Sequence, residues 1–185
     1  MDVVKKIIFV LSVFSVAFYK AQTLSVDELI HFPHQDADSI TVQLVTKGWE
    51  ASNIEFVSDS NFVRRTWRVK NSYDDLKSFL ILYEYTGDPA ENHIIYQFSS
   101  RETFKNYKEQ LVGKGYKLLI EKKSKRRSRR HDKDMFKQVD EAFYSDKKTS
   151  ILNISEVFFY GMNTFMIYSY KTESALGKNL LHDRP

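Results

Sequence analysis

The chain has 185 residues, of which 42% are hydrophobic and 28% are charged, a balance typical of one globular domain rather than of a disordered segment. Its formal net charge is +4, but residues 122–133 alone carry +7, so the remainder is mildly acidic and lacks the broad basic face of a dedicated nucleic-acid-binding protein. The absence of cysteine excludes disulfides, thiolate metal sites and cysteine nucleophiles.

The first 21 residues have the order of a secretory signal peptide. Lys5 and Lys6 precede about a dozen apolar residues, and small residues follow. The apolar run is shorter than the about 20 residues that cross a bilayer. We expect cleavage after Ala21, or alternatively after Ala17, and a mature chain that is periplasmic or secreted and keeps no integral membrane span.

The mature chain contains a short internal repeat. QLVTKGWE (residues 43–50) and QLVGKGYK (residues 110–117) share five identical residues at an offset of 67. The same offset aligns the apolar positions of one helical face. These positions are Ala37, Ile40, Leu44 and Val45, which fall on Phe104, Tyr107, Leu111 and Val112. The pattern predicts two equivalent helices.

The ends of these helices have recognisable signals. Gly48 and Gly115 stand where a helix closes with a left-handed residue. Ser99 with Glu102 predicts a capping box for the second helix, and Ser25 starts another capping box for a short leading helix.

After each helix the hydrophobic period changes from 3.6 to 2, which indicates strands. The expected strands lie in residues 61–70, 77–86 and 93–99, and then in residues 134–144, 149–155 and 164–170. Ile95 and Tyr96 match Ile167 and Tyr168 at an offset of 72. We therefore predict an α+β fold of two tandem αβββ-like repeats, residues 22–99 and 100–171, forming one domain with an antiparallel sheet and helices packed on one side. Residues 172–185 are expected to form a loose C-terminal tail.

One candidate binding surface is the basic run at residues 122–133. Its candidate contacts are Lys122, Lys123, Lys125, Arg126, Arg127, Arg129 and Arg130. Such a cluster is able to neutralise a polyanion, but the pattern favours a solvated hairpin turn. No zinc-finger, helix-turn-helix or RNA-binding motif accompanies it, so no specific nucleic-acid readout is expected.

Two further surfaces are candidates for protein contacts. One is the polar side of the strand at residues 61–70, with Arg64 and Arg68. The other is a possible turn tip with Phe158, Phe159, Tyr160 and Met162, a composition that is enriched at interfaces.

The sequence nominates no catalytic residue, metal site or cofactor. HExxH, GxSxG and phosphate-binding glycine motifs are absent, and His31 and His34 flank Pro33 in what reads as a helix-to-helix turn. We expect an exported, non-enzymatic binding protein for another envelope or extracellular protein. The alternatives are a polyanion-binding protein that uses residues 122–133 for acidic lipid head groups, glycans or extracellular nucleic acid, and an exported hydrolase with an unrecognised site.

The layout of two tandem units of about 70 residues behind a signal peptide resembles the secreted β-lactamase inhibitor proteins. This resemblance implies a sheet that grips another protein, and it assigns no residues.

Overall fold

The computed structural model describes residues 23–69, 78–123, 136–159 and 162–182, so the predicted signal peptide lies outside the described residues. The described strands form one antiparallel sheet of eight strands in the order β1-β2-β3-β4-β8-β7-β6-β5. The fold is therefore α+β, as the sequence predicted.

The elements follow one another as a short helical lead and then two similar series. The lead is α2 (Val26–His31) and the 3-10 turn η1 (Phe32–His34). The first series is α3 (Ala37–Thr46), β1 (Trp49–Val57), β2 (Phe62–Val69), β3 (Ser78–Tyr85) and β4 (His93–Phe98). The second is α4 (Arg101–Gly113), β5 (Lys117–Lys123), β6 (Phe136–Ser145), β7 (Ser150–Phe159) and β8 (Met162–Lys171), followed by α5 (Ala175–His182).

Each long helix is thus followed by four strands, and the expected count of three was too low. The additional strands are β1 and β5, which lie at the two edges of the sheet. Edge strands lack clear alternation because both of their faces are accessible; in β1, residues 51–56 are all exposed. The order of elements agrees with a duplication, but the tandem repeat itself stays a prediction.

One detail of the predicted repeat is wrong. Ile95 pairs with Tyr168, and Tyr96 pairs with Ile167, across the β4–β8 contact. Tyr96 and Ile167 are buried beneath the helices, whereas Tyr168 lies on the opposite face of the sheet. An offset of 72 would therefore equate residues on opposite faces, so it cannot relate the strands of the two halves.

The helix boundaries follow the local signals closely. Gly48 and Gly115 have φ angles of 82° and 85°, which confirms the left-handed closures. The N-cap of α4 is Ser100, whose side chain accepts from the Thr103 amide, and not Ser99 as expected. Val45 and Val112, which the periodicity placed on the buried face, are 56% and 61% exposed.

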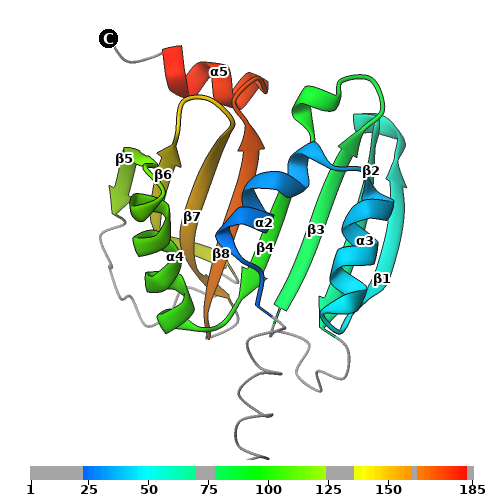
Figure 1. Ribbon diagram of the computed structural model, residues 1–185, viewed down its shortest axis with the longest axis horizontal. Helices are drawn as coiled ribbons and strands as arrows, with labels where there is room; N and C mark the ends of the chain where they lie inside the picture. The colour runs from blue at the N-terminus through cyan, green and yellow to red at the C-terminus, as the bar shows by residue number, and fades with distance from the viewer. Residues whose placement is uncertain (1–22, 70–77, 124–135, 160–161, 183–185) are drawn as a thin grey trace, which may run out of the picture.

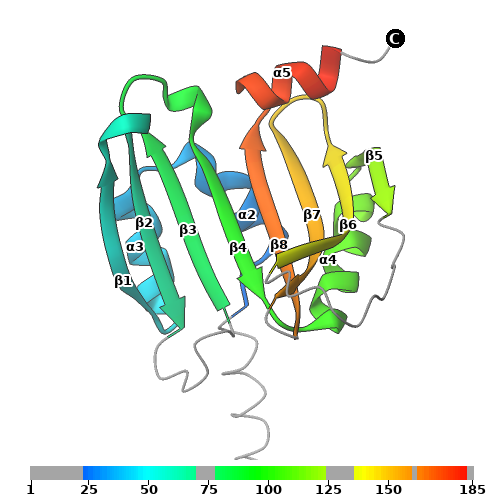
Figure 2. The same cartoon turned by 180° about the vertical axis from the view of Figure 1, so that it is seen from behind.

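Helices α2, α3 and α4 cover one face of the sheet (Figure 1), and in the view from behind no helix of the described residues covers the other face (Figure 2). The core lies between the helices and the covered face. Its largest fully buried side chains include Trp49, Trp67, Tyr96, Phe32 and Phe165. We call the uncovered side the open face.

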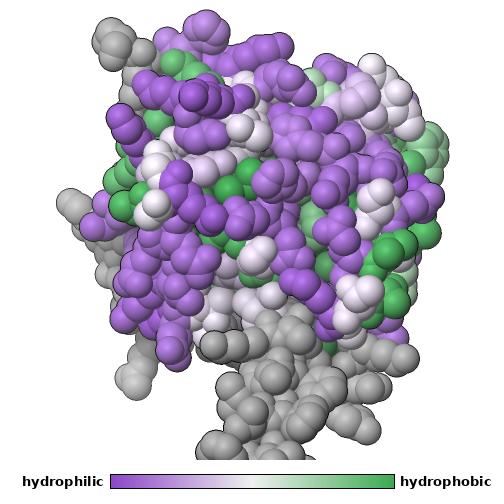
Figure 3. Space-filling model, viewed as in Figure 1, coloured by the Kyte–Doolittle hydropathy of each residue, from purple (hydrophilic) through white to green (hydrophobic). Residues whose placement is uncertain are grey.

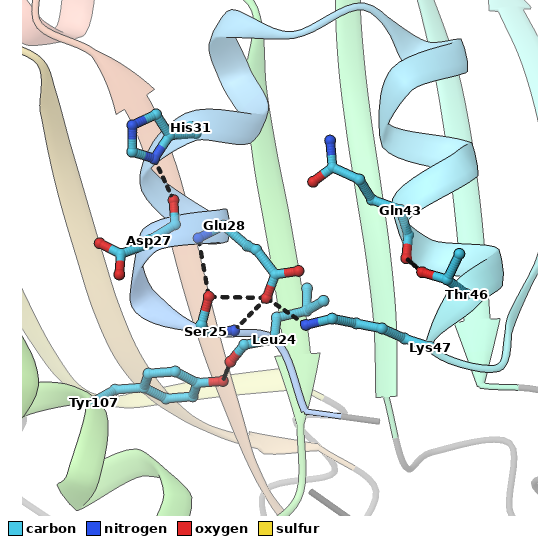
Figure 4. Close-up of polar contacts among 9 residues, drawn as sticks. All are labelled: Leu24, Ser25, Asp27, Glu28, His31, Gln43, Thr46, Lys47 and Tyr107. Carbon is cyan, nitrogen blue, oxygen red and sulfur yellow. Dashed lines mark hydrogen bonds and ion pairs between the residues drawn. The ribbon is translucent and has the colours of Figure 1, made fainter. Parts of the chain in front are cut away.

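Helix α2 joins the two halves (Figure 4). Lys47, at the end of α3, donates to Glu28 of α2 at 2.6 Å. The Tyr107 hydroxyl of α4 donates to the Leu24 carbonyl just before α2. The helical layer is thereby held by polar contacts from both series.

The C-terminal segment is not the loose tail that the sequence suggested, because residues 175–182 form α5. The Glu91 carboxylate accepts a hydrogen bond of 2.7 Å from the Ala175 amide at its start. Gly177 is buried, and a Cβ there would lie 2.5 Å from the Thr172 carbonyl oxygen.

None of the helices in the described ranges combines the length and the apolar character that a membrane span requires.

Candidate functional site: the open face of the sheet

Two rows of side chains cross the open face, because antiparallel pairing places one residue of each strand opposite the next. The first row contains Glu55, Arg64, Tyr83, His93, Tyr170 and Ile151. The second contains Thr66, Ile81, Ile95, Tyr168, Asn153 and Phe143. Both rows run across the junction between β4 and β8, so both halves of the chain contribute.

Aromatic rings dominate the centre of this face. The rings of Tyr83 and His93 stack at 4.6 Å with an interplanar angle of 9°, and His93 lies 5.2 Å from the ring of Tyr170. Phe62 contacts both Tyr83 and Tyr85, at 5.2 Å and 5.3 Å. Aromatic pairs of this kind contribute about 0.5–1.5 kcal/mol each beyond their buried area. We call Phe62, Tyr83, Tyr85, His93, Tyr168 and Tyr170 the aromatic row.

Burial favours the neutral forms of His93, Tyr168 and Tyr170 in the aromatic row. Burial lowers the pKa of His93, and it outweighs the hydrogen bond to the Glu91 carbonyl that acts in the other direction. Burial also raises the pKa of Tyr168 and of Tyr170. A neutral aromatic surface with polar tips is the composition found at the centre of protein interfaces.

Part of the open face is covered by β6, a strand of the sheet itself. Figure 2 shows the first part of β6 lying across the lower ends of β7 and β8. The β6–β7 pairing has a register shift between Gln138 and Asp140, and such a bulge bends a strand. Accordingly Ser155 and Val157 are each only 2% exposed although no described helix covers them. The accessible part of the face is centred on β3, β4 and the β8 tyrosines.

The two arginines predicted for this face lie on it, but neither contributes a free charge. Arg64 pairs with Glu55, and Arg68 pairs with Glu50 at 3.0 Å, in both cases across the β1–β2 ladder. The first row therefore begins with a neutralised ion pair, and the face is not basic.

The basic run connects two neighbouring antiparallel strands, as a hairpin loop does. Lys122 and Lys123 end β5 and are 66% and 71% exposed; they pair with Glu141 at 3.4 Å and with Glu121 at 3.3 Å. The remaining candidates, Lys125, Arg126, Arg127, Arg129 and Arg130, lie outside the described residues.

The aromatic tip lies at the end of the β7–β8 hairpin. Phe158 is 39% exposed, the largest exposure of any aromatic side chain in the second half of the described chain. Phe159 ends β7 and Met162 begins β8, but their side chains and Tyr160 lie outside what the structure describes. The contact role of this tip stays a prediction.

A second apolar surface lies at the β1 edge. Figure 3 shows hydrophobic surface gathered over α3 and β1, at the right of the helix-covered side. Val42 of α3 and Ile54 and Phe56 of β1 are each more than 60% exposed. This surface lies on the helix side of the sheet, separate from the aromatic row.

His31 and His34 belong to the turn between α2 and α3. His31 Nδ1 lies 2.6 Å from the Asp27 carbonyl oxygen, and Asp36 caps α3 by accepting from Ser39. The turn reading of this segment is confirmed. Within the described ranges, no three metal-ligating side chains gather in one place.

Sequence reasoning missed the aromatic row. The sequence predicts a strand over residues 77–86 but not which face of it is covered. Ile81, Tyr83 and Tyr85 point to one face of the sheet, while Leu80 and Leu82 point to the buried face. The placement of both tyrosines on the same face was the available signal for an aromatic face outside the core.

Comparison with known proteins adds no assignment: no family model, no curated protein and no solved structure matches the chain.

Proposed function

We propose that this is an exported binding protein whose open face docks another envelope or extracellular protein. The observation that carries the proposal is the aromatic row, which lies on a sheet face that none of the described helices covers. Tyrosine is enriched at interface hot spots because it offers a large apolar ring and a polar tip at low entropic cost. We also propose that residues 22–99 and 100–171 are tandem repeats, so that the face is formed by two related halves.

The aromatic row is suited to binding because its rings are already ordered. Tyr83 is held between His93 and Phe62, at 4.6 Å and 5.2 Å. A partner that docks there does not have to immobilise these side chains, which otherwise costs about 0.5–1.5 kcal/mol for each rotamer-rich side chain.

The polyanion alternative has less support from the described residues. Lys122 and Lys123 each already lie near a carboxylate, as do Arg64 and Arg68. Neutralised cations release fewer counterions from a polyanion and so bind it more weakly.

The test is capture from the envelope fraction of the native host with three forms of the mature chain: wild type, Ile95→Lys and Val45→Lys. Ile95 lies at the centre of the open face, and Val45 is 56% exposed on α3. Both variants introduce the same charge. We expect a protein that is retained by the wild type and by Val45→Lys but is depleted at least tenfold with Ile95→Lys. The melting temperatures of the three forms should agree within about 2 °C. Identical sets of retained proteins on all three forms would contradict the proposal.

A further inference from the structure

An unsatisfied acceptor lies on the open face beside the aromatic row. Asn153 of β7 is 7% exposed, and its Nδ2 donates to Glu141 Oε1 at 2.7 Å. A carboxylate only accepts hydrogen bonds, so the amide nitrogen must face Glu141 and the Oδ1 atom must face away. Asn153 Oδ1 is buried and has no hydrogen-bond partner among the residues that the structure describes. Because leaving a buried acceptor unpaired is costly, the position calls for a donor.

The surroundings of this acceptor are aromatic and anionic. Tyr168 lies directly opposite Asn153 in β8, and Phe143 lies opposite it in β6. The rings of Tyr168 and Tyr170 are parallel within 4°, with centroids 6.2 Å apart. Burial raises the pKa of both phenols, and the negative charge of Glu141 raises it further.

Together these groups favour a cation over other ligands. An anion would be repelled by Glu141, and an apolar group would leave Asn153 Oδ1 unpaired. A guanidinium or ammonium group supplies both N–H donors and positive charge, and it binds favourably at aromatic rings and at carboxylates. The Glu141 side chain keeps 16% of its surface exposed, so this cluster borders solvent.

A lysine of the chain itself, Lys122, already lies next to these groups. Lys122 Nζ lies 3.4 Å from Glu141 Oε2 and 5.8 Å from the centre of the Phe143 ring. Its side chain is 66% exposed, so the contact is a weak surface pair. It leaves Asn153 Oδ1 unpaired. Lys122 is therefore a competitor that a better-fitting cation displaces.

We infer that Glu141, Asn153, Tyr168 and Tyr170 bind a basic side chain, and that an arginine or lysine of the protein partner anchors there. This inference rests on the proposed function and names the chemistry of its partner. It also assigns to Lys122 the role of an internal competitor at that site, in place of the role in polyanion binding considered from the sequence.

The test uses small probes and the mature chain, so it does not depend on knowing the partner. N-acetyl-arginine amide is titrated while the ring resonances of Tyr168 and Tyr170 are followed by NMR, and N-acetyl-citrulline amide serves as the uncharged isostere. We expect saturable shifts with the arginine probe and weaker binding of citrulline by about tenfold or more. Tetramethylammonium, which has charge but no N–H donor, should bind more weakly than arginine.

Three variants sharpen the result. Glu141→Gln, which can still accept from Asn153, should weaken arginine binding about tenfold, whereas Lys122→Ala should strengthen it. The matched control is Glu121→Gln, which removes the same charge from an ion-paired carboxylate of β5 and should change nothing. The inference is overturned if citrulline binds as well as arginine, if arginine produces no saturable shifts, or if Glu141→Gln behaves like the control. A loss of partner capture by Ile95→Lys together with a failed arginine titration would remove this inference and leave the proposed function standing.

Discussion

Replacing Tyr107 with phenylalanine tests how the helical layer holds the two halves together. The Tyr107 hydroxyl donates to the Leu24 carbonyl, and the tyrosine is only 3% exposed. Phenylalanine preserves the ring, which packs against Phe98 at 5.4 Å, and removes the hydroxyl, which also hydrogen-bonds to the Tyr96 side chain. The buried carbonyl would then lose this donor, at a cost of about 1–3 kcal/mol. For a chain of this length each kcal/mol lowers the melting temperature by about 2–4 °C.

At the middle of this range, about 2 kcal/mol, we expect Tyr107→Phe to melt about 4–8 °C lower than the wild type in a calorimetric scan. Tyr168→Phe is the matched control, because the Tyr168 hydroxyl donates only to the weak acceptor Met166 Sδ at 3.5 Å; its melting temperature should fall by no more than about 2 °C. Equal shifts for the two variants would refute the claim that the contact between α4 and Leu24 stabilises the fold.

Three more changes have defined outcomes. Burial alone would raise the pKa of Glu28, but hydrogen bonds from Lys47 and Ser25 outweigh it and lower the pKa. The ionised Glu28 carboxylate therefore stabilises the fold fully above the pKa of the unfolded chain, about 4.3, and this stabilisation is lost as the pH falls through the pKa of the folded protein. Glu28→Gln should accordingly reduce the fall in the free energy of unfolding that urea denaturation measures between about pH 5 and pH 3. Gly48→Ala should destabilise the protein by about 1–2 kcal/mol because its φ is 82°, whereas a matched alanine substitution of the last α4 residue, Gly113, should be neutral or stabilising in the same assay. Gly177→Ala should speed amide hydrogen exchange in residues 175–182 without changing exchange in the sheet, because the new Cβ would clash with the Thr172 carbonyl.

Local signals in the sequence predicted the helices well because helix ends depend on a few adjacent residues. The left-handed glycines and the capping box at Ser25 and Glu28 are both present. The cap of α4 moved by one residue because Ser99 and Ser100 are adjacent and either hydroxyl is able to cap.

The strands were harder to predict because their environment depends on the whole sheet. Residues 49–57 look irregular because β1 is an edge strand, and only the fold reveals this. The aromatic row depends on pairing between β4 and β8, which are about 70 residues apart in the chain. The positions of the tyrosines can be read in the sequence, but the strand register that places His93 beside Tyr170 cannot.

The environment of the candidate arginines likewise depends on contacts between strands. Arg64 and Arg68 were identified correctly as residues of a polar strand face, but their partners Glu55 and Glu50 lie on another strand. A count of charges along residues 61–70 alone would therefore overstate the positive potential of that surface.

Site-specific photo-crosslinking in the native host tests the central claim most directly. A benzophenone amino acid placed at Ile95 lies in the middle of the open face, and one placed at Val45 lies on the helix side as a control. We predict one discrete adduct from position 95 that is absent from position 45 and is suppressed by the second substitution Tyr83→Ser. An adduct from position 45 with none from position 95 would contradict the assignment of the open face as the binding surface.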